Sequence, residues 1–485
     1  MDDGNHHSVA SINSFLAWVA ASNGSSPFVP AGISQLAGVS IVALSFLDRE
    51  WSIASPGFSR WLVPPAALAI HLSIGQAYAF SVFKNPLLAL HGADGAVWNL
   101  KEVGYIFSIA IAFLGISAAL FGAWLERVGP RRAMFYSAVC FGSGFCVAAL
   151  GANLHSLALI YLGYGVIGGI GLGLGYISPV STLIKWFPDR PGLATGLAIM
   201  GFGGGAMIGG PLATNLMAYF KAHGEAMIPM TFITMGVLYF IFMMFGVFTI
   251  RVPAPDWKPA GWTGNKQSAL ISTHNVDVAT AWKTPQFFLL WIVLCTNVTA
   301  GIGILEQASP MIQDLFKGTI GPAAAVGFVG LLSLFNMGGR FFWASVSDFI
   351  GRKATYFCFF TIGAVLYFFL PSLHTVWAFV GVACLLLSMY GGGFATIPAY
   401  LKDLFGGYNV SAIHGRLLTA WSTAGIVGPL IVNGILDHYV ATGQPKAQAY
   451  PIILHIMSGL LLVGFVANLM VRPVAEQYWL KDQTA

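Results

Sequence analysis

Long apolar runs of about 20 residues, separated by short polar loops, recur along most of the chain. We count twelve between residues 61 and 471, and each is long enough to cross a hydrocarbon core as a helix that rises about 1.5 Å per residue. They occupy residues 61–83, 103–124, 133–152, 156–180, 192–218, 227–250, 285–306, 322–345, 354–371, 374–400, 415–436 and 449–471. The pattern predicts an all-α membrane protein with twelve transmembrane helices.

The polar connection at 251–284, rich in Pro, Gly and Ser, is the longest in this region. It predicts a cytoplasmic linker between two six-helix bundles at 57–250 and 285–472, followed by a cytoplasmic tail at 473–485. Internal similarity supports two halves, because LFGAWLERVGPRR at 120–132 resembles RFFWASVSDFIGRK at 340–353. GYISP around Tyr176 likewise matches GFATIP around Phe394. We expect two parallel copies related by an axis along the membrane normal.

The first 56 residues form an extension that we interpret as cytoplasmic or interfacial. Residues 28–46 are long enough to cross the membrane. A span there would move the N-terminus to the outside, and this alternative stays open.

Charge and composition limit the class of protein. Only 8% of residues are charged, against about 25% in soluble domains, and 17 of the 23 Lys and Arg fall on one side of the predicted topology. The positive-inside rule then places both termini in the cytoplasm. We expect the protein to lie in the plasma membrane, which is the inner membrane in a Gram-negative cell. The net charge of +5 is spread over short loops, so we expect the protein to contact a bilayer and not a nucleic acid. We also expect a monomer.

No pattern in the sequence indicates an enzyme. The five cysteines lie in apolar segments without CxxC spacing, and the histidines are scattered, so we expect no metal site and no cofactor. The glycine ladder at 163–176 contains G-x-G-x-x-G. It lies inside an apolar span and not after a strand, so we interpret it as close helix packing and not as a dinucleotide site.

A loop pattern of the form G-x-x-x-D/E-x-x-G-x-R/K-R/K occurs once in full and once imperfectly. Its positions are Gly122, Glu126, Gly129, Arg131 and Arg132 in the first copy, and Asp348, Gly351, Arg352 and Lys353 in the second. This pattern resembles the major facilitator superfamily. The resemblance implies a gate latch, with the acid facing a helix N-terminus and basic residues across the interface between the halves; plain positive-inside topology is the simpler alternative.

Arg340 is a cation inside an apolar run. It lies twelve residues before Arg352, about 18 Å along a helix, which puts it near mid-membrane, where a charge costs about 2.5–3.5 kcal/mol on insertion scales. Snorkelling or an acid on another helix could compensate, yet acids within the spans are nearly absent. We therefore expect Arg340 to face a central cavity and to bind an anionic substrate.

Several stretches resemble the oxalate:formate antiporter family within that superfamily, over roughly residues 57–475. They are GQAYAFSVFKNP, GYISPVSTLIKWFPDRPGLATG, TPQFFLLWIVLCTNVTAGIG, LFNMGGRFFWASVSD and HGRLLTAWSTAGIVGP. The resemblance implies that Arg340 binds the substrate carboxylate. It also implies an aromatic cavity lining, for which the matching positions are Tyr78, Tyr176, Tyr390 and Phe394.

One position departs from that family. The antiporter for oxalate uses a second cation, a lysine, in the eleventh helix, where this chain has Trp421. We expect Trp421 to belong to the aromatic lining of the cavity. A dianion beside one cation would keep an uncompensated charge in a low dielectric. We therefore predict a small monocarboxylate of the formate, pyruvate or lactate type. Arg416 could restore a dicarboxylate site if it reached the cavity.

Coupling is left open by the sequence. Candidates for proton coupling are His71 and, more weakly, Glu306 and His414; without a titrating group, exchange is favoured. A lipophilic drug exporter with a structural Arg340 and a transporter-like sensor are the alternatives from other classes.

Overall fold

The computed structural model describes residues 45–91, 95, 97–262, 270–272 and 274–480. Residues from Leu47 onward form one compact unit. The apolar stretch 28–46, which we considered as an additional span, falls almost wholly outside the described residues.

Among these residues, eleven helices are long and apolar enough to cross a membrane, and a bent helix pair makes twelve when it is counted as one span. The bent pair consists of α3 (Val63–Ile74), a 3₁₀ turn (Gly75–Ala79) and α4 (Ser81–Leu88), with a bend of 45°. Spans two to six are α5 (Leu100–Val128), α6 (Pro130–Asn153), α7 (Leu157–Ile160) continued through a π-helical turn into α8 (Gly168–Trp186), α9 (Pro191–Ala222) and α10 (Met227–Thr249).

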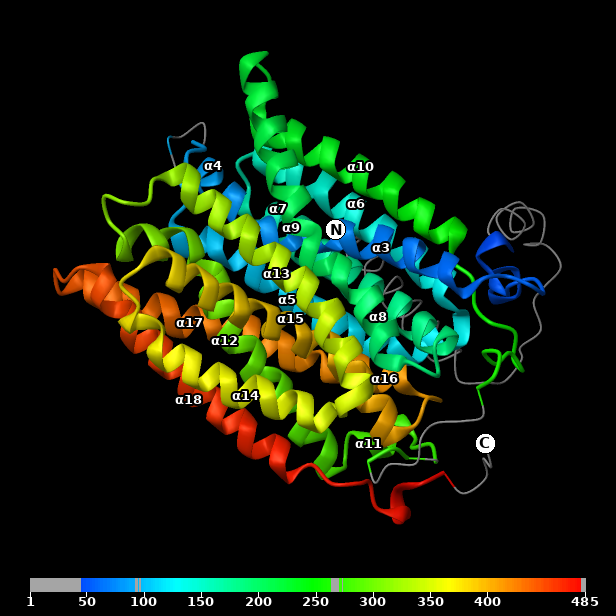
Figure 1. Cartoon of the computed structure of the whole chain (residues 1–485). Helices are drawn as coiled ribbons and strands as arrows, with labels where there is room; N and C mark the ends of the chain where they lie inside the picture. The colour runs from blue at the N-terminus through cyan, green and yellow to red at the C-terminus, as the bar shows by residue number, and fades with distance from the viewer. Residues whose placement is uncertain (1–44, 92–94, 96, 263–269, 273, 481–485) are drawn as a thin grey trace, which may run out of the picture. The chain divides into compact units, whose positions relative to one another are not determined.

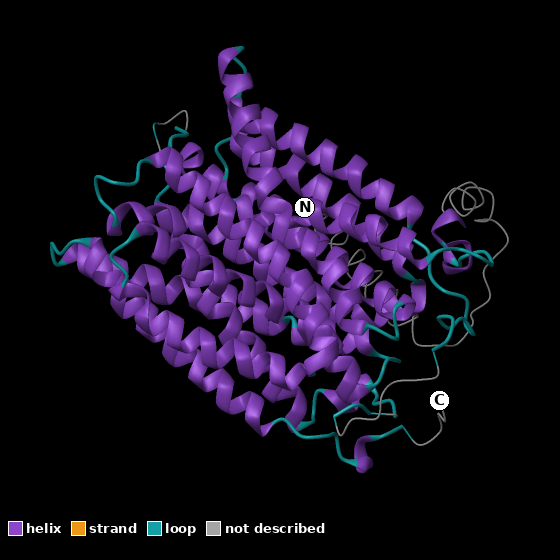
Figure 2. Cartoon of the chain, in the orientation of Figure 1, coloured by secondary structure: helices purple, strands orange, loops and turns teal. Residues whose placement is uncertain are grey.

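The other six spans follow the short helix α11 (Val278–Ala281). They are α12 (Pro285–Leu315), α13 (Pro322–Ile350), α14 (Arg352–Phe369), α15 (Val376–Phe405), α16 (Val410–Leu417) continued as α17 (Thr419–Ala441), and α18 (Ala449–Met470). Each of the twelve predicted apolar runs corresponds to one of these spans, and the described elements are helices and loops (Figure 2). The all-α membrane fold predicted from the sequence is confirmed, whereas the predicted bundle boundaries stay a prediction.

Local sequence explains where several spans begin and turn. Proline stands in the first turn of α6, α9, α12 and α13, where its missing N–H would have no helical partner anyway. Gly129 joins α5 directly to α6, and Gly351 joins α13 to α14, both with φ of 86°. A side chain is strained at that φ, so the glycine of the loop pattern is required by the one-residue turn itself.

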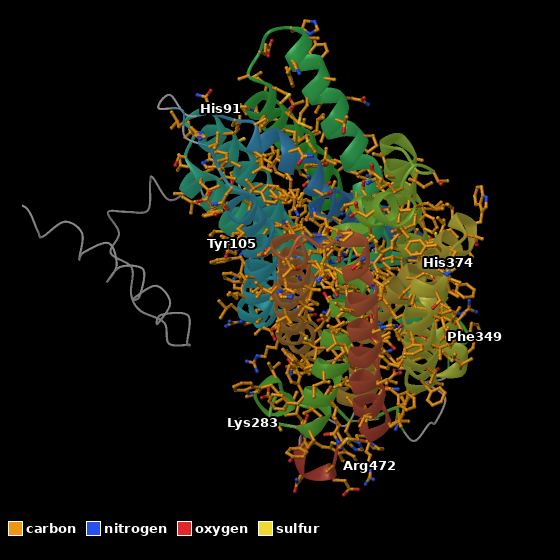
Figure 3. The ribbon with its side chains drawn as sticks, turned by 90° about the vertical axis from the view of Figure 1, so that its left-hand side faces the viewer. His91, Tyr105, Lys283, Phe349, His374 and Arg472 are labelled. Carbon is orange, nitrogen blue, oxygen red and sulfur yellow. The ribbon has the colours of Figure 1, made fainter. Side chains whose placement is uncertain are left out.

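Large apolar side chains cover the outward faces of the spans. Phe349 and Trp377 are 83% and 87% exposed, and α10 and α18 carry further exposed Phe, Ile, Leu and Val. An apolar exterior of this kind fits lipid and not water. Figure 3 shows Lys283 and Arg472 at one end of the helices, and His91 lies toward the other.

Two interfaces join the first six spans to the last six. Helix α13 packs between α9 and α15, and α5 packs against α16 and α17 (Figure 1). Glycines permit the contact, because a Cβ on Gly192 would lie 2.1 Å from the Ala344 carbonyl oxygen and one on Gly115 would lie 2.0 Å from Ser422 Oγ. The backbones therefore approach at small residues, as in other membrane helix pairs.

The end of the helices that carries residues 126–132 and 348–353 is called the motif end below. The segment before α3 is attached there: Asp48 forms an ion pair with Arg132, and Ser52 and Ala54 exchange backbone hydrogen bonds with Val252 after α10. Arg60 forms an ion pair with Asp189 in the loop before α9. The last part of the N-terminal extension is thus ordered against the first six spans.

Candidate functional site

Arg340 lies on α13 and is fully buried. Its Nε donates to Asn336 Oδ1 at 3.0 Å, one turn earlier, and Nη1 donates to the Ile199 carbonyl of α9 at 3.4 Å. Gly203 of α9 leaves room for the guanidinium, since a Cβ there would lie 3.0 Å from Nε. Nη2 makes no hydrogen bond with the described residues. The guanidinium is therefore held along one edge and available on the other.

Aromatic rings from both sets of six spans surround this cation. The guanidinium carbon lies 5.6 Å from the ring centroid of Phe202 on α9 and 5.0 Å from that of Phe394 on α15, within the range of cation–π attraction. Trp421 of α17 contacts both rings, with centroid distances of 5.1 Å and 4.6 Å. These contacts stabilise the cation without neutralising it.

Three tyrosines complete the cluster. Tyr78 and Tyr390 share a hydroxyl–hydroxyl hydrogen bond of 2.9 Å across the two sets of spans, and the Tyr176 ring lies 5.2 Å from that of Trp421. The bend in the first span positions Tyr78, because it falls in the 3₁₀ turn between α3 and α4. The structure thus brings together all six residues that the sequence predicted to line the cavity, Arg340, Tyr78, Tyr176, Tyr390, Phe394 and Trp421. We call them, with Phe202 and Asn336, the arginine cluster.

Sequence reasoning missed Phe202 and Asn336. The spacing of four residues between Asn336 and Arg340 on one helix was a signal that could have identified Asn336. Phe202 gave no such signal, since an aromatic residue in a glycine-rich span is equally suited to lipid or to core.

No described acid neutralises Arg340. The described ion pairs of this chain involve Arg60, Arg132, Lys185 and Arg352, and the side chain of Glu306 lies outside the described part. Arg416 does not join the cluster: it donates to the Val278 carbonyl at 2.8 Å and stacks on Trp282. The arrangement offers one desolvated cation to a ligand, which suits one anionic group of small size.

Two predicted proton-coupling candidates border the cluster. His71 of α3 and His414 of α16 flank the Tyr176 ring at centroid distances of 5.4 Å and 5.9 Å. Both histidines are buried. The described residues contain no group of three or more His, Cys, Asp or Glu side chains that could hold a metal ion.

The acids of the two loop patterns each cap a helix from the other set of spans. Asp348, at the end of α13, accepts from the backbone N–H groups of Gly192 and Leu193 at 2.8 Å each, in the first turn of α9. Glu126, near the end of α5, accepts from the Ser411 N–H of α16 at 3.2 Å. Exposed N–H groups and the helix dipole make a helix N-terminus attractive for a carboxylate. Both acids therefore face helix N-termini, as the loop pattern predicts.

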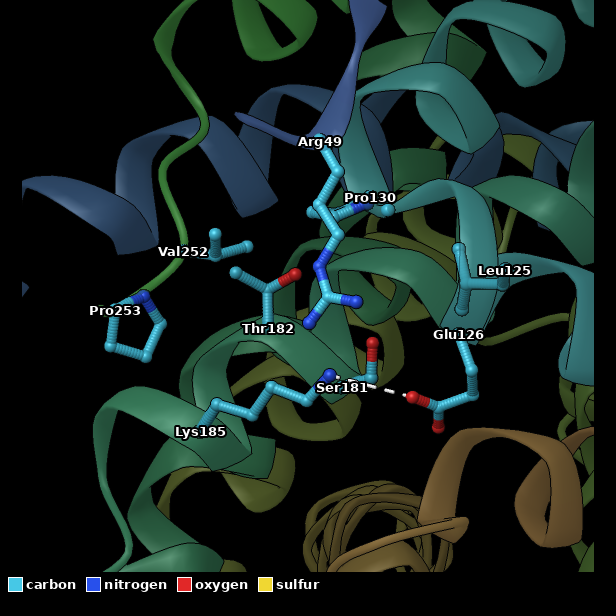
Figure 4. Close-up of a pocket in the computed structure, with 10 residues that line it drawn as sticks. Arg49, Leu125, Glu126, Pro130, Ser181, Thr182, Lys185, Val252 and Pro253 are labelled. Carbon is cyan, nitrogen blue, oxygen red and sulfur yellow. Dashed lines mark hydrogen bonds and ion pairs between the residues drawn. The ribbon is translucent and has the colours of Figure 1, made fainter. Parts of the chain in front are cut away.

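The basic residues of the patterns have partners within their own set of spans. Arg131 donates to the Ile250 carbonyl at 3.3 Å, Arg132 binds Asp48, and Arg352 binds Asp348 and Asp403 at 2.6 Å and 3.1 Å. We expected basic residues across the interface, but these contacts instead brace the loops. Lys185 binds Glu126 at 3.4 Å, and Figure 4 shows Arg49 entering the same pocket.

Three similar proteins are named for the organic anions that they transport. The oxalate:formate antiporter of Oxalobacter formigenes is 26% identical over 88% of this chain and 96% of its own length. Apicoplast pyruvate carrier 1 of Toxoplasma gondii is 24% identical over 65% of this chain and 66% of its own length. Among solved structures, the human organic anion transporter MFSD10 (TETRAN) aligns with a TM-score of 0.61 at 15% identity, covering 86% of this chain and 100% of that one.

The family itself is shown by the sequence. The model of the Major Facilitator Superfamily matches residues 51–348, more than half of the chain, and the twelve-span helical fold agrees with it. The protein is a multi-pass membrane transporter and not an enzyme, and it belongs to the Major Facilitator Superfamily.

Proposed function

We propose that the protein is a secondary active transporter of a small organic monocarboxylate, of the formate, pyruvate or lactate type, and that it works by alternating access. One observation carries the proposal: the buried Arg340 guanidinium keeps Nη2 without a hydrogen bond among the described residues, inside a cluster built from both sets of six spans. Guanidinium groups bind carboxylates and phosphates through charge-assisted hydrogen bonds, and of these two anions the carboxylate is the smaller.

The number of charges favours one carboxylate over two. Trp421 occupies the position where the related oxalate antiporter family has a lysine, and Arg416 is engaged with Val278 and Trp282. A dicarboxylate would leave one charge without a cation in a low-dielectric space. The Tyr78–Tyr390 pair can serve a neutral oxygen of the substrate, because one of its two hydroxyls keeps a proton to donate.

The location of the site supports alternating access. The arginine cluster draws residues from α8, α9 and the bent first span on one side, and from α13, α15 and α17 on the other. Rocking of one half against the other would open the cluster to each side of the membrane in turn. By the positive-inside rule the motif end faces the cytoplasm of a plasma membrane, so the capped helix N-termini form the cytoplasmic gate, with Gly122, Gly129 and Gly351 in the turns and packing positions that shape it.

A dicarboxylate/formate exchanger is the second candidate. It is favoured by one specific observation, the 26% identity to an oxalate:formate antiporter across 96% of that protein.

Counterflow in proteoliposomes tests the proposal. Vesicles preloaded with unlabelled pyruvate, lactate, formate or oxalate receive labelled pyruvate, formate or oxalate outside. We expect exchange of a monocarboxylate that falls at least about 100-fold in Arg340→Gln, because charged hydrogen bonds contribute about 1.5–3 kcal/mol each. Arg416→Gln, a matched loss of a helical arginine, should keep the exchange.

The outcomes separate the candidates. Oxalate exchange equal to that of any monocarboxylate would refute the single-charge argument. Transport of neutral lipophiles that persists in Arg340→Gln, without carboxylate exchange in the wild type, would favour an exporter with a structural arginine.

A further inference from the structure

Two histidines lie directly behind the arginine cluster, one from each set of six spans. His71 is 0% exposed and His414 is 2% exposed, and the Tyr176 ring stands between them. Tyr176 in turn contacts Phe202 and Trp421, at centroid distances of 5.6 Å and 5.2 Å. A continuous line of contacts therefore joins both imidazoles to the rings that enclose Arg340.

Several polar atoms of this layer make no well-formed hydrogen bond with the described residues. Neither ring nitrogen of His71 makes a well-formed hydrogen bond with the described residues, and the same holds for His414 Nε2 and the Tyr176 hydroxyl. A buried polar atom without a partner costs about 1–3 kcal/mol, so a bound proton that brought new hydrogen bonds to this layer would be favourable. The backbone carbonyls of Ala67 and Tyr176 lie beside the His71 ring and can accept from its N–H groups when both nitrogens carry protons.

The charged groups nearby define when a proton can enter. Arg340 and His414 act electrostatically on His71, and α9 packs close to its side chain at Gly201, where an added Cβ would lie 3.0 Å from the His71 Cβ. A second cation beside Arg340 is unfavourable in a low-dielectric interior. Once a carboxylate occupies Arg340, that repulsion is offset, and an imidazolium gains an anion within the same desolvated space.

The remaining titratable groups on helices packed against the two histidines are engaged elsewhere or belong to the packing. Their described partners are as follows: Glu126 of α5 with Lys185 of α8, Asp403 of α15 with Arg352, Lys402 of α15 with the Pro188 carbonyl, Arg131 of α6 with the Ile250 carbonyl, Arg416 of α16 with the Val278 carbonyl, Tyr239 of α10 with the rings of Phe141 and Phe145, and Tyr400 of α15 with the ring of Tyr356. Among the titratable side chains that the structure describes near the cluster, we therefore assign His71 and His414 to bind a proton.

We propose that His71 and His414, with Tyr176 between them, form a proton site that fills together with the anion on Arg340, so that the protein carries one proton with each monocarboxylate. This inference rests on the proposed function. The empty site carries one net positive charge, that of Arg340. The loaded site carries the same net charge, because the negative carboxylate and the positive imidazolium cancel. Transport is then electroneutral and driven by a pH gradient.

His414 also provides the route for the proton. It lies on α16 three residues after Ser411, whose N–H is held by Glu126 at the motif end. Opening of that contact brings the start of α16 toward water, and His414 lies one turn deeper along the same helix. A proton taken up there needs to cross only the Tyr176 ring to reach His71.

Calorimetric titration of the purified full-length protein with pyruvate tests the proposal. Pyruvate is fully ionised near neutral pH, so any proton taken up on binding must enter the protein. Titrations in two buffers of different ionisation enthalpy give the number of protons. We expect about one proton per pyruvate, and a dissociation constant that rises about tenfold per pH unit where the free site is unprotonated.

Substitutions locate the proton. In His71→Gln/His414→Gln, proton uptake should vanish and the affinity should become independent of pH, while pyruvate still binds. His438→Gln, which removes an exposed histidine of α17, should leave both quantities unchanged.

The outcomes are distinguishable. Pyruvate binding to the wild type without proton uptake, or uptake that survives in the double variant, overturns the proton site and leaves the proposed function standing. Absence of binding by pyruvate, lactate and formate in folded wild-type protein overturns the proposed function, and the proton site with it. The wild-type pH profile needs no substitution, so poor folding of the variants leaves the decision intact.

Discussion

The two acid caps at the motif end descend from similar loop patterns but differ in strength. Asp348 accepts two N–H bonds of 2.8 Å and binds Arg352, and both side chains are below 10% exposed. Glu126 accepts one N–H bond of 3.2 Å and binds Lys185 at 3.4 Å, with side chains 17% and 39% exposed. The copy that departs from the full pattern makes the stronger contact.

The difference has a geometric reason. The shorter Asp348 side chain lies where α13 crosses the start of α9 at Gly192, so both carboxylate oxygens meet N–H groups at once. Glu126 has the equivalent position, two residues before the end of α5, but it meets one N–H group of α16 and shares its charge with an exposed lysine. Charged hydrogen bonds in a desolvated place are worth about 1.5–3 kcal/mol each, whereas exposed pairs give about 0–1 kcal/mol. We therefore expect the α9–α13 contact to dominate closure of the motif end.

Arg352→Ala is expected to have the largest effect. Arg352 holds Asp348 and Asp403 together and also donates to Ser347, so its loss leaves two buried carboxylates unpaired, at a cost of about 3–5 kcal/mol. Thermal unfolding in detergent should show a clear drop in Tm. Arg132→Ala, which breaks the more exposed pair with Asp48, should cost at most about 1 kcal/mol. Equal drops in the two variants would contradict the comparison.

Asp348→Asn should open the motif end more than Glu126→Gln does. The first change weakens two charged bonds, about 1.5–3 kcal/mol each, and the second weakens one long bond to a partly exposed acid. A reporter is available in Ser411→Cys, a nearly isosteric change at a buried position on α16, in protein whose five native cysteines are replaced by serine. Labelling by an impermeant maleimide should accelerate about tenfold or more in Asp348→Asn and only a few-fold in Glu126→Gln. The reverse order would assign the dominant contact to α5 and α16.

Glycine substitutions give the smallest expected differences. A Cβ at Gly192 would meet the Ala344 carbonyl at 2.1 Å, and one at Gly122 would meet Ala412 Cα at 2.8 Å, so both alanine variants should lose stability by about 1–3 kcal/mol, with Gly192→Ala the worse. Gly338→Ala has nothing within 4 Å and should be neutral or slightly stabilising, since alanine favours helix. A loss of stability in Gly338→Ala as large as that in Gly192→Ala would contradict this expectation. It would show that an added methyl group destabilises the helices themselves and not the places where they cross.

Much of the site could be predicted from single residues. Arg340 was identifiable because a cation in an apolar run has few explanations, and the aromatic positions followed from a family resemblance. Phe202 and Asn336 escaped, and so did the partners of Arg131 and Arg132. Which face of a helix meets a neighbour depends on the rotation of the helix and on the crossing angle. In an apolar span, the face buried in protein and the face covered by lipid have similar residues, so the sequence does not distinguish them.

The sequence by itself determined the membrane class, the twelve spans, the glycine turns at 129 and 351, and the presence of one unexplained cation, because each depends on composition and spacing along one segment. Only the tertiary structure decided that six aromatic residues from five other spans enclose that cation, that the rings of His71 and His414 lie on either side of Tyr176, and that Asp348 makes shorter hydrogen bonds than Glu126. Those facts are contacts between segments up to about 340 residues apart, and their distances are set by how helices pack, which local patterns do not encode.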